Sequence, residues 1–537
     1  MSKFSFRSAM AAAVALALAA TAASGCRAGE VAPEETSPAV FSPFEPTPTP
    51  GQSPGADSRF TLRYDPDDTL NPFTGLNADN MAVASLMYES LFALDESFSP
   101  VPVLCESFTS ENSEAYVFTI KRGVLMSDGE ELTAADVVYS LDRARSLPKF
   151  SERLGCIESV SASGDMEVSV ALNRANNKLP SLLDIPIVRQ NSADGAMPVG
   201  SGPYTFSGGE GGASLTALPA HRERAKLPVQ VIYLLSCTDA ELVELFAEYK
   251  VDMYRNDPTG LMSAETRRDH EIRYYDTTTL QYLGFSARLP VMRDAELRRA
   301  IDLCVDREHI VKDIMSGCAL PAPLILSPAF YGYDSGWDAP PDDTFLEISD
   351  MLSRLGLRDS NSDLFLEYPV SASEYAPFSL DFIVNSENRR KTESAKSICD
   401  ALRRVGLDVS LRLLPWDKFT KALEDGDFDI YYGETSLPAD FDVTALVARD
   451  GALNFGGAGN DDYGEYIEAF LASESDTQKD VTARHLCEKI KRDAVIAPIL
   501  YKQYAVHSGR NVISGIRPTQ TSIFFGLADW KIESNRL

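Results

Sequence analysis

The stretch that decides the fold is LDFIVNSENRRKTESAKSICDALRRVGLDVSLRLLPWDKFTKALEDGDFDIYYG, residues 380–433. It opens with a short apolar run typical of a buried strand, and the next segment has apolar residues three or four apart, which predicts one face of a helix. Those residues are Ala395, Ile398, Cys399, Leu402 and Val405. Gly406 then ends the helix as a left-handed cap. A second strand (DVSLRLL), a second helix (WDKFTKALEDG) and a third strand (DFDIYYG) follow, so we expect a βαβαβ unit with a mainly parallel, helix-covered sheet.

The end of the third strand is a candidate binding site. Parallel sheets covered by helices bind ligands beyond the carboxyl ends of their strands. The third strand ends at Tyr431-Tyr432-Gly433-Glu434. We therefore expect Tyr432, Gly433 and Glu434 to lie near a ligand.

Outside this unit, strand and helix signals alternate from about residue 59 to the end. FTLRY (60–64), AYVFTI (115–120) and MEVSVAL (166–172) have the alternation of half-buried strands. A single core stops growing near roughly 250–300 residues, so 537 residues predict at least two lobes. The net charge of -29 argues against a nucleic-acid partner, because a phosphate backbone needs Lys and Arg.

The N-terminus predicts an exported, membrane-anchored protein. Residues 1–26 combine a positive start (Lys3, Arg7) with an alanine-rich apolar run and a small-residue end, which is typical of a signal peptide. That end, Ala23-Ser24-Gly25-Cys26, resembles a lipobox, which predicts cleavage before Cys26 and a lipid on its thiol. The alternative is ordinary signal cleavage beside an incidental cysteine. Residues 27–58 are rich in Pro, Ser, Thr and Glu and predict a flexible tether, so the membrane is reached through the lipid anchor only.

Catalytic and metal-binding motifs are missing from the sequence. The five histidines are scattered without an HExxH pair, no CxxC pair occurs, and neither GxSxG nor a phosphate loop is present. We therefore predict a protein that is not an enzyme and has no metal site and no cofactor. The seven cysteines after Cys26 are an odd number within apolar patterns, which favours mostly free thiols.

Five segments in chain order carry a resemblance to a known family. They are PDDTLNP (66–72), YESL (88–91), SDGEELTAADVVYS (127–140), VGSGPY (199–204) and DAELRRAID (294–302) with DRE (306–308). In the third segment Thr133 and Asp136 have the spacing of a helix capping box. Together the segments resemble the extracellular solute-binding proteins, family 5, which include dipeptide-, oligopeptide- and nickel-binding lipoproteins.

The resemblance implies an α/β fold of the type II periplasmic-binding-protein kind, a two-lobed clamshell with an extra α/β subdomain in the first lobe. The first lobe would span residues 59–285 with the subdomain at about 89–199, the second lobe 286–496, and the return to the first lobe 497–537. The implied function is the monomeric, extracytoplasmic substrate-binding component of an ABC importer. Such a component binds a peptide-like solute between its lobes by hinge closure and delivers it to permease and ATPase subunits.

The resemblance also implies an anchor for the solute. In peptide-binding relatives an acidic residue pairs with the peptide's amino terminus, and its position falls on Glu434, with Asp440 and Asp442 as further candidates. The family's Asp-Pro pair is missing here, and the alternative for Glu434 is local capping of the backbone.

Four other residues have two interpretations each. Tyr282 lines the cleft or packs in the core, Trp416 stacks on solute or packs in the core, and Arg389 and Arg390 meet a carboxylate or form a solvated helix end. Two other functions also remain open: a binder of nickel or another non-peptide solute, and a surface sensor or adhesin that kept the fold.

Overall fold

The computed structural model describes residues 60–532 apart from 209–211, 261–268, 338–342, 372–373, 459–461 and 511. The predicted signal peptide with Cys26 and the predicted tether lie outside the described residues. In the described part of the chain, no helix combines the length and the apolar character needed to cross a membrane.

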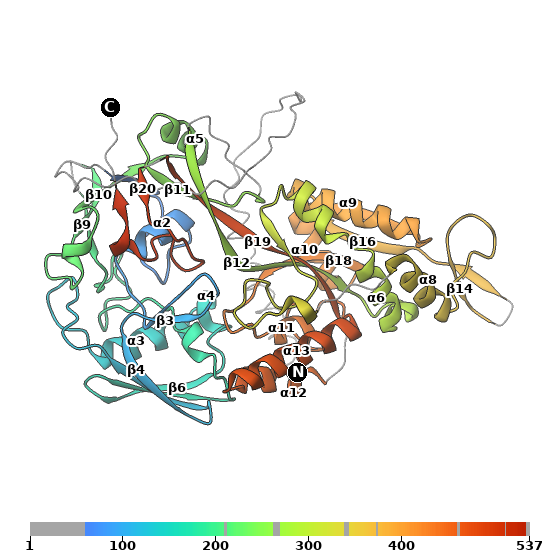
Figure 1. Cartoon of the computed structure of the whole chain (residues 1–537), viewed down its shortest axis with the longest axis horizontal. Helices are drawn as coiled ribbons and strands as arrows, with labels where there is room; N and C mark the ends of the chain where they lie inside the picture. The colour runs from blue at the N-terminus through green and yellow to red at the C-terminus, as the bar shows by residue number, and fades with distance from the viewer. Residues whose placement is uncertain are drawn as a thin grey trace.

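One mixed sheet of eleven strands runs through the molecule (Figure 1). Ten strands follow the order β17-β16-β18-β12-β19-β11-β1-β10-β9-β8, and β13 pairs with β19. The strands are β1 (Phe60–Tyr64), β8 (Tyr204–Ser207), β9 (Ala213–Ala217), β10 (Val231–Ser236), β11 (Met253–Asn256), β12 (His270–Phe285), β13 (Ala319–Pro321), β16 (Leu380–Asn385), β17 (Val409–Leu414), β18 (Ile430–Ser436) and β19 (Ile496–Gly509).

The predicted βαβαβ unit is confirmed at the β17 end of this sheet. β16 pairs in parallel with both β17 and β18. The connecting helices are α9 (Arg389–Arg404) and α10 (Trp416–Asp425). α9 ends as predicted, because Gly406 has a φ of 85° that a residue with a side chain rarely adopts.

The other end of the sheet belongs to the N-terminal half of the chain. β1 pairs in parallel with β10 and β11, and α2 (Ala78–Ala84) and α5 (Asp239–Ala247) follow β1 and β10. A separate four-stranded sheet, β4-β5-β7-β6, lies below it in Figure 1 within the predicted subdomain. The strands of this sheet are β4 (Cys105–Glu111), β5 (Ala115–Ile120), β6 (Ile157–Gly164) and β7 (Glu167–Leu172). The subdomain also contains the helices α3 (Ala134–Arg145) and α4 (Pro148–Ser151). The Asp136 carboxylate accepts the Thr133 amide N–H at 2.9 Å, as the predicted capping box requires.

Two large hydrophobic cores divide the molecule into lobes. The first-lobe core draws on residues 60–253, Tyr275, Val506 and residues 513–532, and the second-lobe core on Phe98 and residues 280–501. The chain passes between the cores within β12 and returns within β19 (Figure 1). The core changes between Tyr275 and Leu280 of β12 and again between Tyr501 and Val506 of β19, whereas the predicted lobe boundaries stand at residues 285 and 496.

Helices cover the second-lobe part of the sheet. They are α6 (Ala295–Leu303), α7 (Arg307–His309), α8 (Thr344–Arg354), α11 (Thr444–Val447), α12 (Tyr463–Ala472) and α13 (Asp476–Asp493). The remaining short strands are β2 (Phe92–Leu94), β3 (Pro100–Pro102), β14 (Glu367–Pro369), β15 (Tyr375–Pro377), β20 (Ile513–Ser514) and β21 (Lys531–Ile532).

Candidate functional site

Polar side chains from both lobes meet where parallel strands end. In the first lobe β11 ends at Asn256, and in the second lobe β16 ends at Asn385, just before α9. The side-chain amide of Asn388, the residue that caps α9, donates to the carbonyl oxygen of Thr259 at 3.2 Å. The amino end of α9 therefore lies against the segment that follows β11, which is the placement expected of a ligand site in such sheets.

Glu434 on β18 is the centre of this meeting point. Its Oε2 accepts from Gln281 Nε2 at 2.7 Å and lies 3.1 Å from Lys391 Nζ and 3.8 Å from Lys502 Nζ. Lys502 on β19 also pairs with Asp257, 2.5 Å away in the first lobe. One chain of ion pairs therefore joins α9, β18, β19 and the first lobe.

The electrostatics of Glu434 are dominated by the two lysines. Burial alone would raise the pKa of the carboxyl group, but Lys391 and Lys502 hold it at about 2. Burial likewise lowers the pKa of Lys502, but Glu434 and Asp257 outweigh it and raise the pKa above its ordinary value. Both groups are therefore charged at neutral pH and are satisfied within the protein.

Aromatic rings extend this chain of charges into the first lobe. Tyr275 on β12 pairs with Tyr504 on β19, with ring centroids 6.0 Å apart. The Tyr504 ring has Lys502 Nζ 5.4 Å and Arg255 Cζ 5.3 Å from its centroid. We call this set the interlobe cluster; its members are Lys391, Glu434, Lys502, Asp257, Tyr504, Tyr275 and Arg255.

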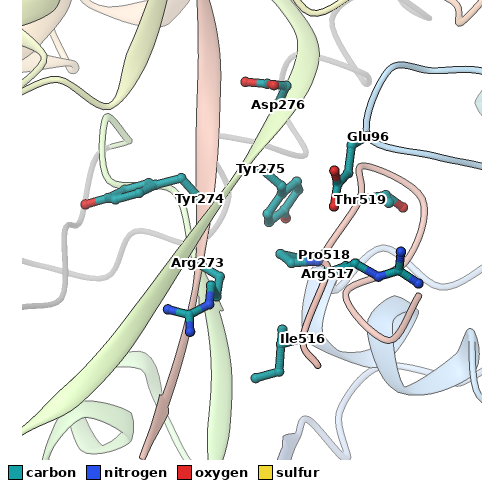
Figure 2. A pocket seen from close by; sticks show the side chains of 9 residues that line it. All are labelled: Glu96, Arg273, Tyr274, Tyr275, Asp276, Ile516, Arg517, Pro518 and Thr519. Carbon is teal, nitrogen blue, oxygen red and sulfur yellow. The ribbon is translucent and has the colours of Figure 1, made fainter. Parts of the chain in front are cut away.

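A cavity of about 220 Å³ lies next to the cluster (Figure 2). It is bounded by residues 273–276 of β12, by residues 516–519 and by Glu96. Figure 2 shows the ring of Tyr275 between β12 and the segment 516–519, so this residue belongs to both the cavity wall and the interlobe cluster. Gln503 Nε2 donates to Asp276 Oδ1 at 2.8 Å beside it.

Comparison with known proteins identifies the family. The profile described as "Bacterial extracellular solute-binding proteins, family 5 Middle" matches residues 99–448, which is more than half of the chain. The chain belongs to this family. The predicted resemblance and the α/β two-lobed fold are thereby confirmed, and the family consists of solute-binding proteins rather than enzymes.

Relatives of this family 5 protein include peptide binders. "Oligopeptide-binding protein AppA" of Bacillus subtilis is 25% identical over 389 residues, 67% of this chain and 70% of the relative. A solved structure of AppA from Bacillus subtilis with a nonapeptide has a TM-score of 0.63 at 20% identity, covering 89% of this chain and all of the other. NikZ from Campylobacter jejuni, solved with Ni(L-His), has a TM-score of 0.65 at 18% identity, covering 89% of this chain and all of NikZ.

The family 5 anchor predicted at Glu434 lies between the lobes, but its neighbours were missed by the sequence analysis. Lys391, Lys502 and Gln281 surround the carboxylate. Lys502 is a lone lysine in the apolar run PILYKQYAV, and Lys391 lies in the first turn of a helix that follows a parallel strand. The first pattern indicates a buried charge that needs a partner, and the second places a charge where a parallel strand ends.

Asp440 and Asp442 lie apart from the interlobe cluster and have other partners. Asn176 Nδ2 of the first lobe donates to Asp440 Oδ2 at 2.8 Å, and Arg174 forms an ion pair with Asp442. Burial and the neighbouring Asp442 raise the pKa of Asp440 to about 6. These carboxylates join the lobes, so an additional role in pairing with a solute ammonium gains no support from their placement.

Tyr282, Tyr432 and Gly433 are packing residues. Tyr282 is 2% exposed with its ring T-shaped against Tyr431, and so it occupies the core rather than lining the cleft. Gly433 lies under that ring, where an added Cβ would be 2.5 Å from Tyr282 Cζ. The Tyr432 hydroxyl donates to Gln281 Oε1 at 2.8 Å and so supports the residue that binds Glu434.

Trp416 and Arg389 have the placements of their non-binding alternatives, core packing and a solvated helix end, whereas Arg390 is hydrogen-bonded within the protein. Trp416 begins α10 and packs against the second-lobe core, with its ring 6.0 Å from that of Phe419. Arg389 is exposed and pairs with Glu393 at 2.7 Å. Arg390 donates to the carbonyl of Ile314 and to Ser316 Oγ.

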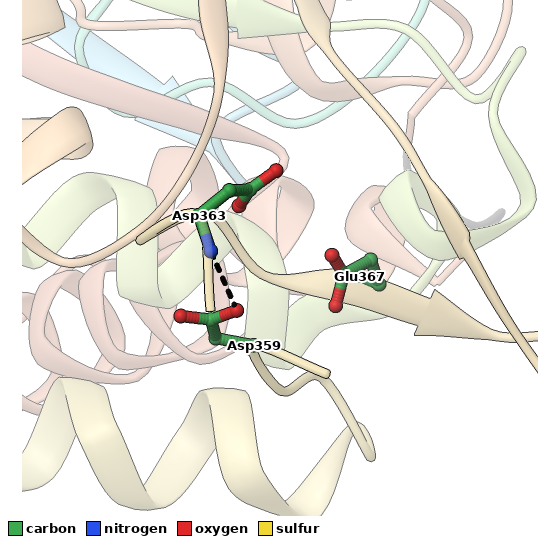
Figure 3. A group of neighbouring side chains, drawn as sticks. All are labelled: Asp359, Asp363 and Glu367. Atoms are coloured by element: carbon green, nitrogen blue, oxygen red, sulfur yellow. Dashed lines mark hydrogen bonds between the residues drawn. The ribbon is translucent and has the colours of Figure 1, made fainter. Parts of the chain in front are cut away.

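One group of carboxylates has the composition of a cation site. Asp359, Asp363 and Glu367 bring one oxygen each within 4.8 Å of one another (Figure 3). The Asp359 carboxylate accepts hydrogen bonds from the amide N–H groups of Ser362 and Asp363 at 2.6 and 3.2 Å. These bonds stabilise the turn of residues 359–363, so the carboxylate has a structural role without an ion. This loop lies between α8 and β14, outside the interlobe cluster, and we assign no metal to it.

The thiols behave as predicted from the sequence. All seven cysteines in the described part of the chain are free, and six of them are buried. Burial raises the pKa of Cys304 and Cys487 to about 12, so neither thiol is ionised at neutral pH. They serve as small apolar residues of the core.

Proposed function

We propose that this family 5 protein is the substrate-binding component of an ABC importer for a peptide-like solute. The solute binds between the two lobes, against the interlobe cluster, and hinge closure about β12 and β19 encloses it. The closed protein delivers the solute to permease and ATPase subunits. Peptide-binding relatives and the family profile support this proposal.

The observation that carries the proposal is the interlobe cluster itself. It joins residues of both lobes through partly or fully buried charges at the carboxyl ends of parallel strands. Hinge closure is a rigid-body rotation about a few connecting segments, and here two long strands connect the cores. A solute that contacts both halves of the cluster stabilises the closed arrangement by binding it more tightly than the open one.

We further propose that the protein acts outside the cytoplasm as a lipoprotein anchored through Cys26. The anchor rests on the sequence, because Cys26 lies outside the described residues. Labelling cells with an alkyne fatty acid should tag the wild-type protein and leave Cys26→Ala unlabelled. Equal labelling of both proteins would contradict the anchor.

Of the five histidines in the chain, none belongs to the interlobe cluster. Nickel and similar borderline metals favour imidazole ligands, so the cluster favours a peptide-like solute over a nickel complex.

Native mass spectrometry of the purified protein with pooled short peptides tests the proposed function. We expect protein–peptide complexes and a melting temperature that rises with peptide concentration. Binding of nickel complexes alone, or no stabilisation by any peptide, would contradict a peptide-like solute.

A further inference from the structure

The carboxylates of the interlobe cluster are already neutralised by the protein. Glu434 has Lys391 and Lys502 within 4 Å, and Asp257 has Lys502. The neighbouring Asp79 on α2 pairs with Arg63 at 2.9 Å. A solute ammonium would have to displace a cation of the chain from each of these groups, so they are poor anchors for an amino terminus.

Arg255 has the opposite character. It is partly buried, and no hydrogen bond or ion pair of its guanidinium occurs among the described residues. It lies over the face of the Tyr504 ring, 5.3 Å from Cζ to the centroid, and, against the lowering effect of burial, the charges of Asp79 and Asp257 help to keep the pKa of the guanidinium raised. Such a guanidinium keeps its five N–H donors available for a planar anion.

Two phenols next to Arg255 are also without hydrogen bonds in the described part of the molecule. Tyr275 is 6% exposed and Tyr504 is partly buried, yet neither hydroxyl has a hydrogen-bond partner there. A phenol O–H that is not used within the protein can donate to an acceptor of a bound solute. Tyr275 lines the cavity of Figure 2, Tyr504 packs against Tyr275 with ring centroids 6.0 Å apart, and Arg255 lies over the Tyr504 ring, so the three donors adjoin one another on one side of the cavity.

We infer that Arg255, with Tyr275 and Tyr504, binds a carboxylate of the solute, and that the site does not require a free solute ammonium. This inference rests on the proposed function and names the end of the peptide that is recognised. A carboxylate accepts two parallel N–H bonds from a guanidinium, and its remaining lone pairs accept from the phenols. Lys391 acts as a specificity residue, because it occupies the carboxylate that an amino terminus would otherwise use.

The test compares one pool of synthetic tri- and tetrapeptides in three versions: free at both ends, N-acetylated, and C-amidated. Native mass spectrometry and calorimetry on the purified protein give the affinity of each version. We expect acetylation to change affinity by less than about threefold and amidation to lower it at least about tenfold, because charge-assisted bonds are lost. Amidated peptides that bind as tightly as free ones, or acetylation that abolishes binding, would overturn the inference while leaving the proposed function standing.

Variants of Arg255 test whether this residue causes the preference for peptides with a free carboxylate. Arg255→Gln should lower the affinity for free-carboxylate peptides to that of the amides and leave the amides unchanged, whereas Arg255→Lys should retain part of the preference. Arg484→Gln, an exposed arginine of α13, is the control for loss of one positive charge. An Arg255→Gln protein that melts normally and keeps its full preference for free carboxylates would contradict the assignment, and no binding of any version would overturn the proposed function as well.

Discussion

Lys502 Nζ lies 3.8 Å from Glu434 Oε2, which ties the strand that returns to the first lobe to the second-lobe strand that ends at the interlobe cluster. Lys502 is 3% exposed at its side chain and Glu434 is 9% exposed. A buried pair of this kind is strongly destabilised when one partner is removed, because the other charge is left uncompensated. The pair therefore links the stability of the second lobe to the charge state of the interlobe cluster.

Glu434→Gln should destabilise the protein at pH 7 by up to about 3 kcal/mol, the equivalent of a carboxyl pKa lowered from 4.5 to about 2. Because the pKa is depressed in the folded state, the stabilisation is complete above pH 4.5 and is lost as the pH falls towards 2. Urea unfolding at a series of pH values should show the two proteins converging on acidification. Glu424→Gln on the exposed face of α10 is the control, and a constant difference from pH 7 to pH 2.5 would contradict the ion-pair origin.

Lys391→Gln should make the protein prefer peptides with a free amino terminus over N-acetylated peptides. Without Lys391, Lys502 is the one cationic partner left to Glu434 among the described residues, so peptides with a free amino terminus should gain at least about threefold over N-acetylated peptides. Competition calorimetry between the two versions measures this ratio. Lys418→Gln on exposed α10 is the matched control, and an unchanged ratio in Lys391→Gln would show that Lys391 does not restrict access to the carboxylate.

Gly433→Ala should destabilise the second lobe by about 1–3 kcal/mol, because the added Cβ would lie 2.5 Å from a Tyr282 ring that is 2% exposed and cannot move aside. Gly464→Ala is the control: it lies within α12 with no atom within 4 Å of the added Cβ, and should be stabilising by about 0.5–1 kcal/mol. Thermal unfolding measures both effects. A neutral Gly433→Ala would mean that the sheet at β18 relaxes more readily than its packing suggests.

His507 should make the first lobe sensitive to acid. Burial, with a contribution from His270, lowers the pKa of His507 from 6.5 to about 4, and its ring stacks on Tyr254 with centroids 4.6 Å apart. The unfolded chain takes up the proton first, so stability falls by up to about 3 kcal/mol as the pH drops from 6.5 to 4. His507→Phe keeps the stacking and should lose most of this dependence, whereas the exposed His485→Gln should retain it. Equal acid sensitivity of wild type and His507→Phe would assign the effect to other groups.

Much of the fold could be predicted because its signals are local. The spacing of apolar residues from Ala395 to Val405 and the glycine at 406 define α9 without any knowledge of the rest of the chain. The position of Glu434 near the carboxyl end of a strand was predictable for the same reason, although β18 continues to Ser436. Its partners were not, because Lys391 and Lys502 reach it from other elements and only the register of β12 with β18 and β19 brings Gln281 beside it.

Tyr282 illustrates the limit of such reasoning. A strand entering the second lobe has two faces, and a shift of one residue exchanges the core-facing and solvent-facing side chains. The register places Tyr282 opposite Gly433 and Gln281 opposite Glu434, so the glutamine contacts the interlobe cluster and the tyrosine packs in the core. Arg255 was not predicted because the sequence does not reveal which arginine lacks a hydrogen bond or ion pair among the residues that the structure describes.

The most direct test is a crystal structure of the protein with a peptide selected by native mass spectrometry. We expect density for the peptide between the lobes, with its carboxylate within hydrogen-bond distance of Arg255 and its amino terminus making no ion pair with Glu434. Density that lies outside the interlobe cluster would contradict the proposed site. A peptide in the cluster with its ammonium on Glu434 and Lys391 displaced would contradict the inferred recognition of the carboxylate.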